Sequence, residues 1–101
     1  MTAAPEIPHD QQLAAAQAVA NHATQKFAAT CEAMHAARGA YTLARASDPA
    51  DQTTDDARQA WAEAAHDLVD AHVAMEQARD EVTAIHRQSA EYAITEETTN
   101  A

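Results

Sequence analysis

The stretch that decides the fold covers residues 47–56 and reads SDPADQTTDD. It separates two long alanine-rich segments and contains the last proline of the chain, Pro49. The residue before a proline avoids the α-helical region, so we expect the first helix to end near Ala46. Thr53 and Asp56 then have the spacing of a capping box, with Thr53 as the N-cap of the next helix. The stretch therefore predicts a short polar turn between two helices.

Outward from this turn, both segments favour helix over most of their length. Alanine loses no side-chain entropy on becoming helical, and the chain contains a single glycine, Gly39. We expect Asp10 to be the N-cap of the first helix, because Pro5 and Pro8 oppose helix before it. The predicted organisation is a flexible lead-in, a hairpin domain and a frayed tail: residues 1–9, 10–97 (with helices at about 10–46 and 54–96) and 98–101.

Apolar residues recur every seven positions along both segments. In the first helix the two rows are Leu13, Ala20, Phe27, Met34, Tyr41 and Ala16, Ala23, Thr30, Ala37, Ala44. In the second helix the two rows are Trp61, Leu68, Met75, Val82, Ser89 and Ala64, Ala71, Ala78, Ile85, Tyr92. Such paired rows are the a and d positions of a coiled coil. The sequence therefore predicts an all-α fold, a two-helix antiparallel coiled-coil hairpin.

The turn also determines which residues of the two helices should face one another. If the chain folds back near residues 50–53, each layer along most of the hairpin sets one large side chain against one small one, as interdigitating helices do. The predicted layers include Ala44 with Trp61, Tyr41 with Ala64, Phe27 with Ala78, Ala16 with Ser89 and Leu13 with Tyr92. In this register Tyr92 is a core residue at the open end of the hairpin.

A further row of small and apolar residues lies outside the predicted core. A two-helix hairpin of 101 residues buries little apolar surface, and association with a partner is the usual remedy. The predicted interface consists of Ala15, Val19, Ala29, Ala33, Ala36, Ala40 and Leu43, interrupted by His22 and Lys26, and of Val69 and Val73 beside Ala62 and Ala65. We therefore expect a protein–protein interaction and assembly module that completes a four-helix bundle, either with a second copy or with a different hairpin.

Charge is distributed unevenly along the chain. The net charge is −10, and residues 48–101 hold thirteen of the 16 acidic side chains. This balance argues against direct binding to nucleic acid, and it favours solubility or a basic protein partner. The alternative function is a small acidic regulator or inhibitor that covers a basic surface, such as an antitoxin, an anti-restriction or anti-CRISPR protein, or a phage accessory protein. The acidic residues that would carry this binding are Asp67, Asp70, Asp80 and Glu81.

The sequence carries no signal for membrane insertion or for cleavable export. The first ten residues, MTAAPEIPHD, contain neither a basic region nor an apolar run. No apolar stretch approaches the roughly 18–20 residues that span a bilayer. Cys31 is the only cysteine, which is typical of a reduced thiol in a cytosol-like compartment. We expect a cytoplasmic protein without membrane insertion.

Two Glu-x-x-His pairs are the sharpest candidates for a chemical site: Glu32 with His35, and Glu63 with His66. The pairing resembles that of ferritin-like di-iron proteins, which makes a metal-binding helical protein the second alternative. In the heptad assignment, however, all four side chains point away from the hairpin seam, so we predict no metal site and no cofactor. The sequence has neither the spacing of a catalytic triad nor a phosphate-binding loop, and we predict that the protein is not an enzyme.

The last part of the chain contributes to a resemblance to a known group of helical hairpins. A hairpin of this length whose second helix reaches Tyr92-Ala93-Ile94-Thr95-Glu96 resembles type VII secretion substrates of the WXG100/ESX and PE kind, and Pro5-Glu6 is similar to the start of the PE group. The chain lacks their Trp-x-Gly turn, since Trp61 lies inside the second helix. The resemblance implies pairing into four-helix dimers, an export element at Tyr92 and Glu96, and secretion without a cleavable signal peptide.

Overall fold

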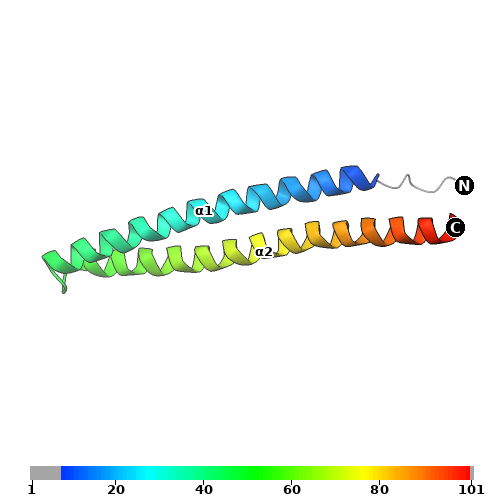
Figure 1. Ribbon diagram of the computed structural model, residues 1–101. Coiled ribbons are helices and arrows are strands. Elements are labelled where there is room, and N and C mark those ends of the chain that lie inside the picture. Colours follow the sequence, from blue (N-terminus) through cyan, green and yellow to red (C-terminus); the bar gives the residue numbers. More distant parts are fainter. Residues whose placement is uncertain (1–7, 101) are drawn as a thin grey trace, which may run out of the picture.

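The computed structural model describes residues 8–100, and over that range the chain forms two α-helices joined by a short turn. α1 spans His9–Ser47 and α2 spans Gln52–Asn100. They run antiparallel, so the start of α1 and the end of α2 lie together, opposite the turn (Figure 1). The pair is elongated, with extents of 76 × 32 × 14 Å. The predicted all-α antiparallel hairpin is confirmed, and the described range contains no strand.

The turn between the helices is short, because α1 ends at Ser47 and α2 already begins at Gln52. α1 ends where Asp48 becomes extended ahead of Pro49, with φ −155° and ψ 101°, as the restriction on a residue before proline requires. The backbone carbonyl of Asp51 then accepts a hydrogen bond from the amide of Thr54 at 3.0 Å, so α2 begins at Gln52. The predicted N-cap at Thr53 is therefore wrong, because Thr53 already lies inside the helix.

The first helix also begins earlier than expected. The carbonyl of Pro8 accepts hydrogen bonds from the amides of Gln11 and Gln12, each at 3.0 Å, and the helix begins at His9. Asp10 is therefore inside α1 and is not its N-cap. A proline fits just before the helix, because no amide hydrogen is needed there.

The second helix is also longer than predicted, at its C-terminal end. α2 continues to Asn100, about one turn beyond the expected end near Glu96. Residues 98–100, assigned to a frayed tail, are thus part of the helix backbone. Residues 1–7, which form most of the predicted lead-in, and Ala101 lie outside the described range.

The register of the two helices differs from the expected one by between one and two helical turns. Tyr41 stacks on Trp61, with ring centroids 5.5 Å apart and an interplanar angle of 27°. The prediction set Trp61 against Ala44 and Tyr41 against Ala64. The cause is the turn: because α2 begins at Gln52, the chain folds back sooner and α2 is displaced along α1.

A displacement in the same direction is present in the middle of the hairpin. Phe27 packs against His72, with ring centroids 5.4 Å apart and an interplanar angle of 55°, and the expected layer of Phe27 with Ala78 is wrong. Ala16 shares a recess with Ile85, where the prediction set it against Ser89. The predicted alternation of one large and one small side chain in each layer therefore fails at the aromatic positions, where ring meets ring.

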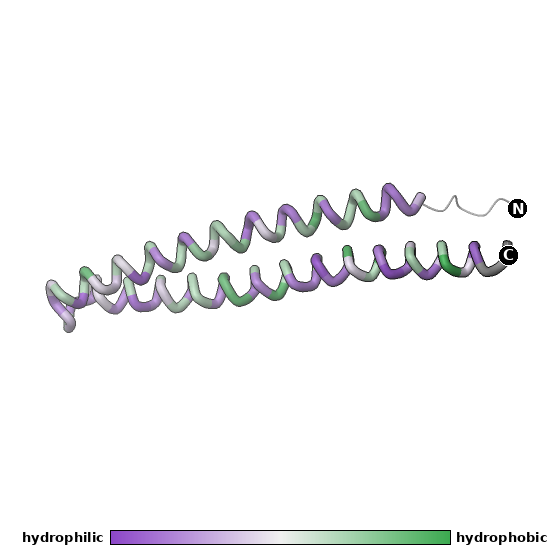
Figure 2. Tube along the Cα trace, viewed as in Figure 1, coloured by the Kyte–Doolittle hydropathy of each residue, from purple (hydrophilic) through white to green (hydrophobic). Residues whose placement is uncertain are grey.

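Few side chains are fully buried between the helices. The buried apolar residues are Ala16, Ala71, Met75, Ala78 and Ile85. Other members of the heptad rows, including Phe27, Met34 and Leu68, are only half-buried. Apolar positions recur along both helices between polar ones (Figure 2). Two helices alone cannot enclose a core residue on all sides, so the hairpin buries little apolar surface for its length.

Tyr92 is not a core residue. Its side chain is 70% exposed, and it lines a shallow recess at the open end of the hairpin with Pro8 and His9. Because α1 begins at His9, no further turn of that helix is present to cover Tyr92. The core role predicted for Tyr92 opposite Leu13 is therefore wrong.

Candidate interaction surface

Exposed residues at regular spacing follow the outer side of α1. Nine exposed positions, separated alternately by four and three residues, make up what we call the α1 seam: Ala15, Val19, His22, Lys26, Ala29, Ala33, Ala36, Ala40 and Leu43. Val19 is 60% exposed and Leu43 is 73% exposed. A single exposed leucine is ordinary, but a row of small and apolar residues at heptad spacing, here interrupted by His22 and Lys26, is the kind of pattern onto which a second helix packs.

A shorter stripe, which we call the α2 stripe, follows α2 and consists of Ala62, Ala65, Val69 and Val73. Val69 is 60% exposed and Val73 is 47% exposed, one helical turn apart, and Ala62 is exposed in the same row. Ala65 is half-buried. Every residue that the sequence assigns to the interface on α1, together with Val69 and Val73, is exposed on the hairpin.

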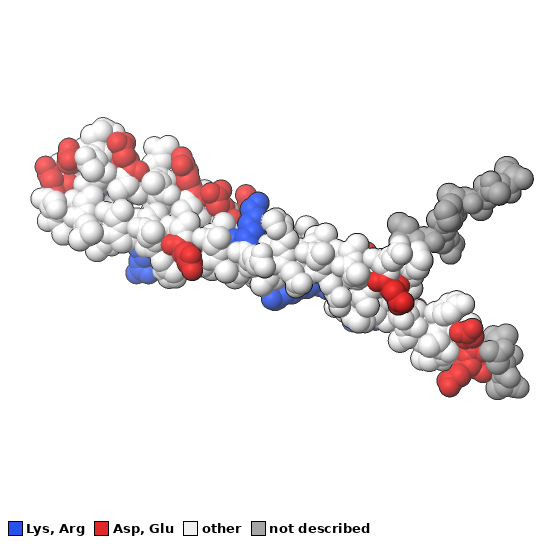
Figure 3. All heavy atoms as spheres, turned by 90° about the horizontal axis from the view of Figure 1, so that it is seen from above, with Lys and Arg blue, Asp and Glu red and all other residues white. Residues whose placement is uncertain are grey.

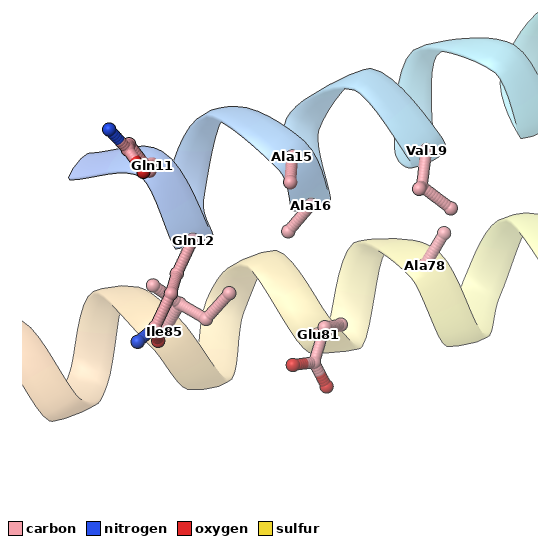
Figure 4. A pocket seen from close by; sticks show the side chains of 8 residues that line it. All are labelled: Gln11, Gln12, Ala15, Ala16, Val19, Ala78, Glu81 and Ile85. Atoms are coloured by element: carbon pink, nitrogen blue, oxygen red, sulfur yellow. The ribbon is translucent and has the colours of Figure 1, made fainter. Parts of the chain in front are cut away.

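A recess lies between the α1 seam and α2 near the open end. Ala15 and Val19 line it from α1, and Glu81 and Ile85 line it from α2 (Figure 4). Gln12 and Ile85 lie at its outer end, and Ala78 lies below Val19 at its inner end. The floor is therefore apolar, and the Glu81 carboxylate stands at its rim.

A second recess lies farther along the same side of the hairpin. Lys26 lines it from α1, and Asp67 and Asp70 line it from α2. Lys26 follows Val19 by seven residues and Asp67 precedes Glu81 by fourteen, so both recesses open on one face. The part of the α1 seam from Ala15 to Lys26 is thus flanked by acidic side chains of α2.

The two Glu-x-x-His pairs lie on outer surfaces of the hairpin. Glu32, His35, Glu63 and His66 are all exposed. Between residues 8 and 100, no group of three or more His, Cys, Asp or Glu side chains is arranged to hold a metal ion. The fold does not bring the two pairs together at one site.

A cluster near the turn was missed by the sequence reasoning. The Arg58 guanidinium carbon lies 5.6 Å from the centroid of the Tyr41 ring, which also stacks on Trp61. Hydrogen bonding to Arg58, and then its positive charge, lower the pKa of Tyr41 below its ordinary value, and the same contacts raise the pKa of Arg58. Asp55 lies 3.4 Å from the same guanidinium group. The heptad rows contain Tyr41 and Trp61, but only the correct register brings them together.

Acidic side chains gather at the turn end of the molecule. Asp48, Asp51, Asp55 and Asp56 are all exposed there, and Figure 3 shows the concentration of acidic groups over that end. Ion pairs between exposed groups, such as Arg58 with Asp55, contribute little to stability. The turn end therefore presents a concentration of negative charge to solvent.

No protein-family description matches the sequence, and comparisons with curated proteins and with solved structures found no significant similarity. Of the two described helices, neither combines the length and the apolar character that crossing a membrane requires.

Proposed function

We propose that the protein is a non-enzymatic interaction and assembly module, which packs exposed helix faces against helices of other protein molecules. One observation carries the proposal: large apolar side chains lie exposed along both helices, namely Val19, Leu43, Val69, Val73, Tyr92 and Ile94. Apolar side chains exposed together in rows mark interaction sites more often than scattered ones do.

The thin core supports the same function. Among the side chains that the structure describes, five apolar ones are buried: three are alanines, and the other two, Met75 and Ile85, both belong to α2. A chain that orders about ninety residues needs more apolar burial than this to offset the loss of conformational entropy. Packing against a second protein would provide it.

Capture of binding partners from a lysate of the source cells tests the proposal. The immobilised full-length chain should retain a defined protein, identified by mass spectrometry and then shown to bind directly after purification. A Val69→Glu and Val73→Glu variant should release a partner that uses the α2 stripe. Ala28→Glu changes an exposed alanine outside both apolar rows and should retain it. A chain that neither binds a second protein nor self-associates would overturn the proposal.

Export by a type VII system is part of this proposal, and the exposure of Tyr92 supports it. Tyr92 and Glu96 lie one turn apart on α2 and are both exposed, so they share a face of the helix. In a host with a type VII system, Tyr92→Ala or Glu96→Ala should abolish secretion, while Glu91→Ala should not. Secretion that persists without the export machinery would contradict this role.

The acidic face supports a second candidate, a regulator or inhibitor that covers a basic protein surface. The acidic side chains gathered at the turn end continue along α2 through Asp67, Asp70, Asp80 and Glu81. Reversing these four charges to lysine should abolish binding to such a partner in calorimetric titration. Binding that survives the reversal, but is lost on substituting Val69 and Val73, would favour the first candidate.

A further inference from the structure

We propose that the α1 seam is the contact between two copies of this chain, which pair antiparallel with Val19 of one copy against Leu43 of the other. This inference deepens the proposed function and rests on it, because it names the partner of one of the two exposed rows. It leaves the α2 stripe for a different contact.

The spacing of the α1 seam is self-complementary. From Val19 to Leu43 the steps are three, four, three, four, three, four and three residues, and they read the same from either end. A two-fold axis across the middle of α1 therefore brings every position in this part of the seam opposite another seam position of the second copy. Val19 meets Leu43 and Ala29 meets Ala33, and each pair occurs twice.

This register also suits the side chains. Val19 and Leu43, the large apolar members of the seam, cover each other. His22 and Lys26 face Ala40 and Ala36, beside which a long side chain can lay its apolar stem along the helix and keep its polar end in water. Small residues at the remaining positions let the two helices approach closely.

Neighbouring registers are less favourable. Sliding one copy by a heptad in one direction sets Leu43 against Lys26, and sliding it in the other direction sets Leu43 against Gln12. In the proposed register Lys26 keeps Asp67 and Asp70 of its own chain alongside, in the recess that all three line. The ammonium group can therefore remain compensated when its stem is covered.

Charge selects α1 over α2 as the helix that two copies share. α1 carries Lys26, Arg38 and Arg45 against Asp10 and Glu32. α2 is strongly acidic, so packing α2 against α2 would bring like charges together. The stripe of Val69 and Val73 spans only about one turn, too short to cover a seam of roughly eight turns. Pairing through α1 therefore places the less acidic helix of each copy at the contact.

The exposed area is sufficient for such a dimer. The chain exposes 7788 Å² at a mass of 10.8 kDa, whereas a compact monomer of this mass exposes about 5,500 Å². Residues 1–7 and 101 account for at most about 1,200 Å² of the exposed area, the value for a fully extended chain. After this is subtracted, the hairpin still exposes roughly 1,000 Å² more than a compact monomer. A stable interface buries about 800 Å² per partner. Pairing with a second copy would bury surface that a compact fold of the same mass would have covered.

Sedimentation equilibrium of the full-length chain tests both the dimer and its register. The unmodified chain should be dimeric, and Val19→Glu or Leu43→Lys alone should weaken the dimer at least about tenfold. The double variant should recover most of this loss, because the new carboxylate of one copy meets the new ammonium of the other at both ends of the seam. A parallel dimer would set like charges together, and the double variant would then be the weakest.

A matched variant on the other helix provides the control. Val69→Glu with Val73→Lys makes the same chemical changes on α2 and should leave the dimer intact. Circular dichroism at each concentration should report whether the helices remain formed. A monomeric unmodified chain, or a double variant no tighter than its parents, overturns the inference. A monomer that binds another protein through the α1 seam overturns it as well, but leaves the proposed function standing.

Discussion

Thr54, in the first turn of α2, places its hydroxyl oxygen 3.1 Å from the backbone carbonyl oxygen of Ala44 in α1. The same hydroxyl lies 2.6 Å from the carbonyl oxygen of Asp48, so its one hydrogen is shared between two acceptors. The residue is 1% exposed. These contacts join the start of α2 to the end of α1 and thereby fix the point at which the chain folds back.

Replacing Thr54 by valine should destabilise the hairpin without changing the shape of the side chain. The substitution removes the hydrogen bonds of a buried hydroxyl, which typically contribute about 0.5–1.5 kcal/mol. The carbonyls of Ala44 and Asp48 keep the backbone amides of Asp48 and Asp51 as donors. Urea denaturation followed by circular dichroism measures the change in the free energy of unfolding. Thr53→Val is the matched control: it is exposed and should stay within about 0.5 kcal/mol of the unmodified chain. Equal effects of the two substitutions would show that the buried hydroxyl has no structural role.

The contact between Tyr41 and Trp61 gives a direct test of the register. With ring centroids 5.5 Å apart, the two side chains should be coupled by about 0.5–1.5 kcal/mol in a double-mutant cycle. Tyr41→Leu, Trp61→Leu and the double variant complete the cycle. A second cycle, of Trp61 with the exposed Tyr92 near the far end of α2, should give no coupling within error. No coupling in the first cycle would contradict this register.

The fold could be predicted from the sequence because the heptad period is a property of each helix alone. Apolar rows every seven residues specify two helices and the faces on which they meet, whatever happens in the turn. The register depends on the turn, where the sequence pattern placed the N-cap of the second helix at Thr53, whereas α2 begins at Gln52. The backbone carbonyl of Asp51 accepts the first helical hydrogen bonds. The prediction used side-chain types, which do not identify the backbone carbonyl at which a helix starts. A difference of two residues there displaced the whole second helix.

The surface was easier to predict than the individual contacts. Val19 and Leu43 were placed outside the core by spacing alone, and both are exposed. Tyr92 was assigned to the core because it continues a d row, but a d position is buried only where the facing helix extends far enough. Since α1 begins at His9, the row continues beyond its partner helix.

The pKa of Tyr41 should report on Arg58 in solution. Hydrogen bonding and charge from Arg58 lower the pKa of Tyr41 in the folded chain. A group whose pKa is lower in the folded than in the unfolded state adds stability above its unfolded pKa, about 10, and loses that contribution as the pH falls through its folded pKa. The stabilisation is therefore absent near neutral pH, where the phenol is protonated in both states, and emerges in alkaline solution.

Absorbance at the tyrosinate band measures this titration. In a Tyr92→Phe background only Tyr41 contributes, and its midpoint should lie below that of a free tyrosine. Arg58→Gln should move the midpoint upward, and added salt should reduce the difference, because Arg58 is exposed and Tyr41 is only half-buried, so that ions can screen the pair. A midpoint that does not respond to the loss of Arg58 would show that the two groups do not meet in solution.

Gly39 offers a stabilising substitution. It lies in the interior of α1, and a Cβ atom built on it meets nothing within 4 Å. Alanine loses less backbone freedom than glycine on folding, so Gly39→Ala should raise the free energy of unfolding by about 0.5–1 kcal/mol. Ala18 is exposed and lies three heptads earlier on the same face of α1, so Ala18→Gly should lower the stability by a similar amount. The pair of variants, compared by urea denaturation, separates helix propensity from contact effects. Destabilisation by Gly39→Ala would mean that another molecule approaches the helix at Gly39 more closely than a methyl group allows.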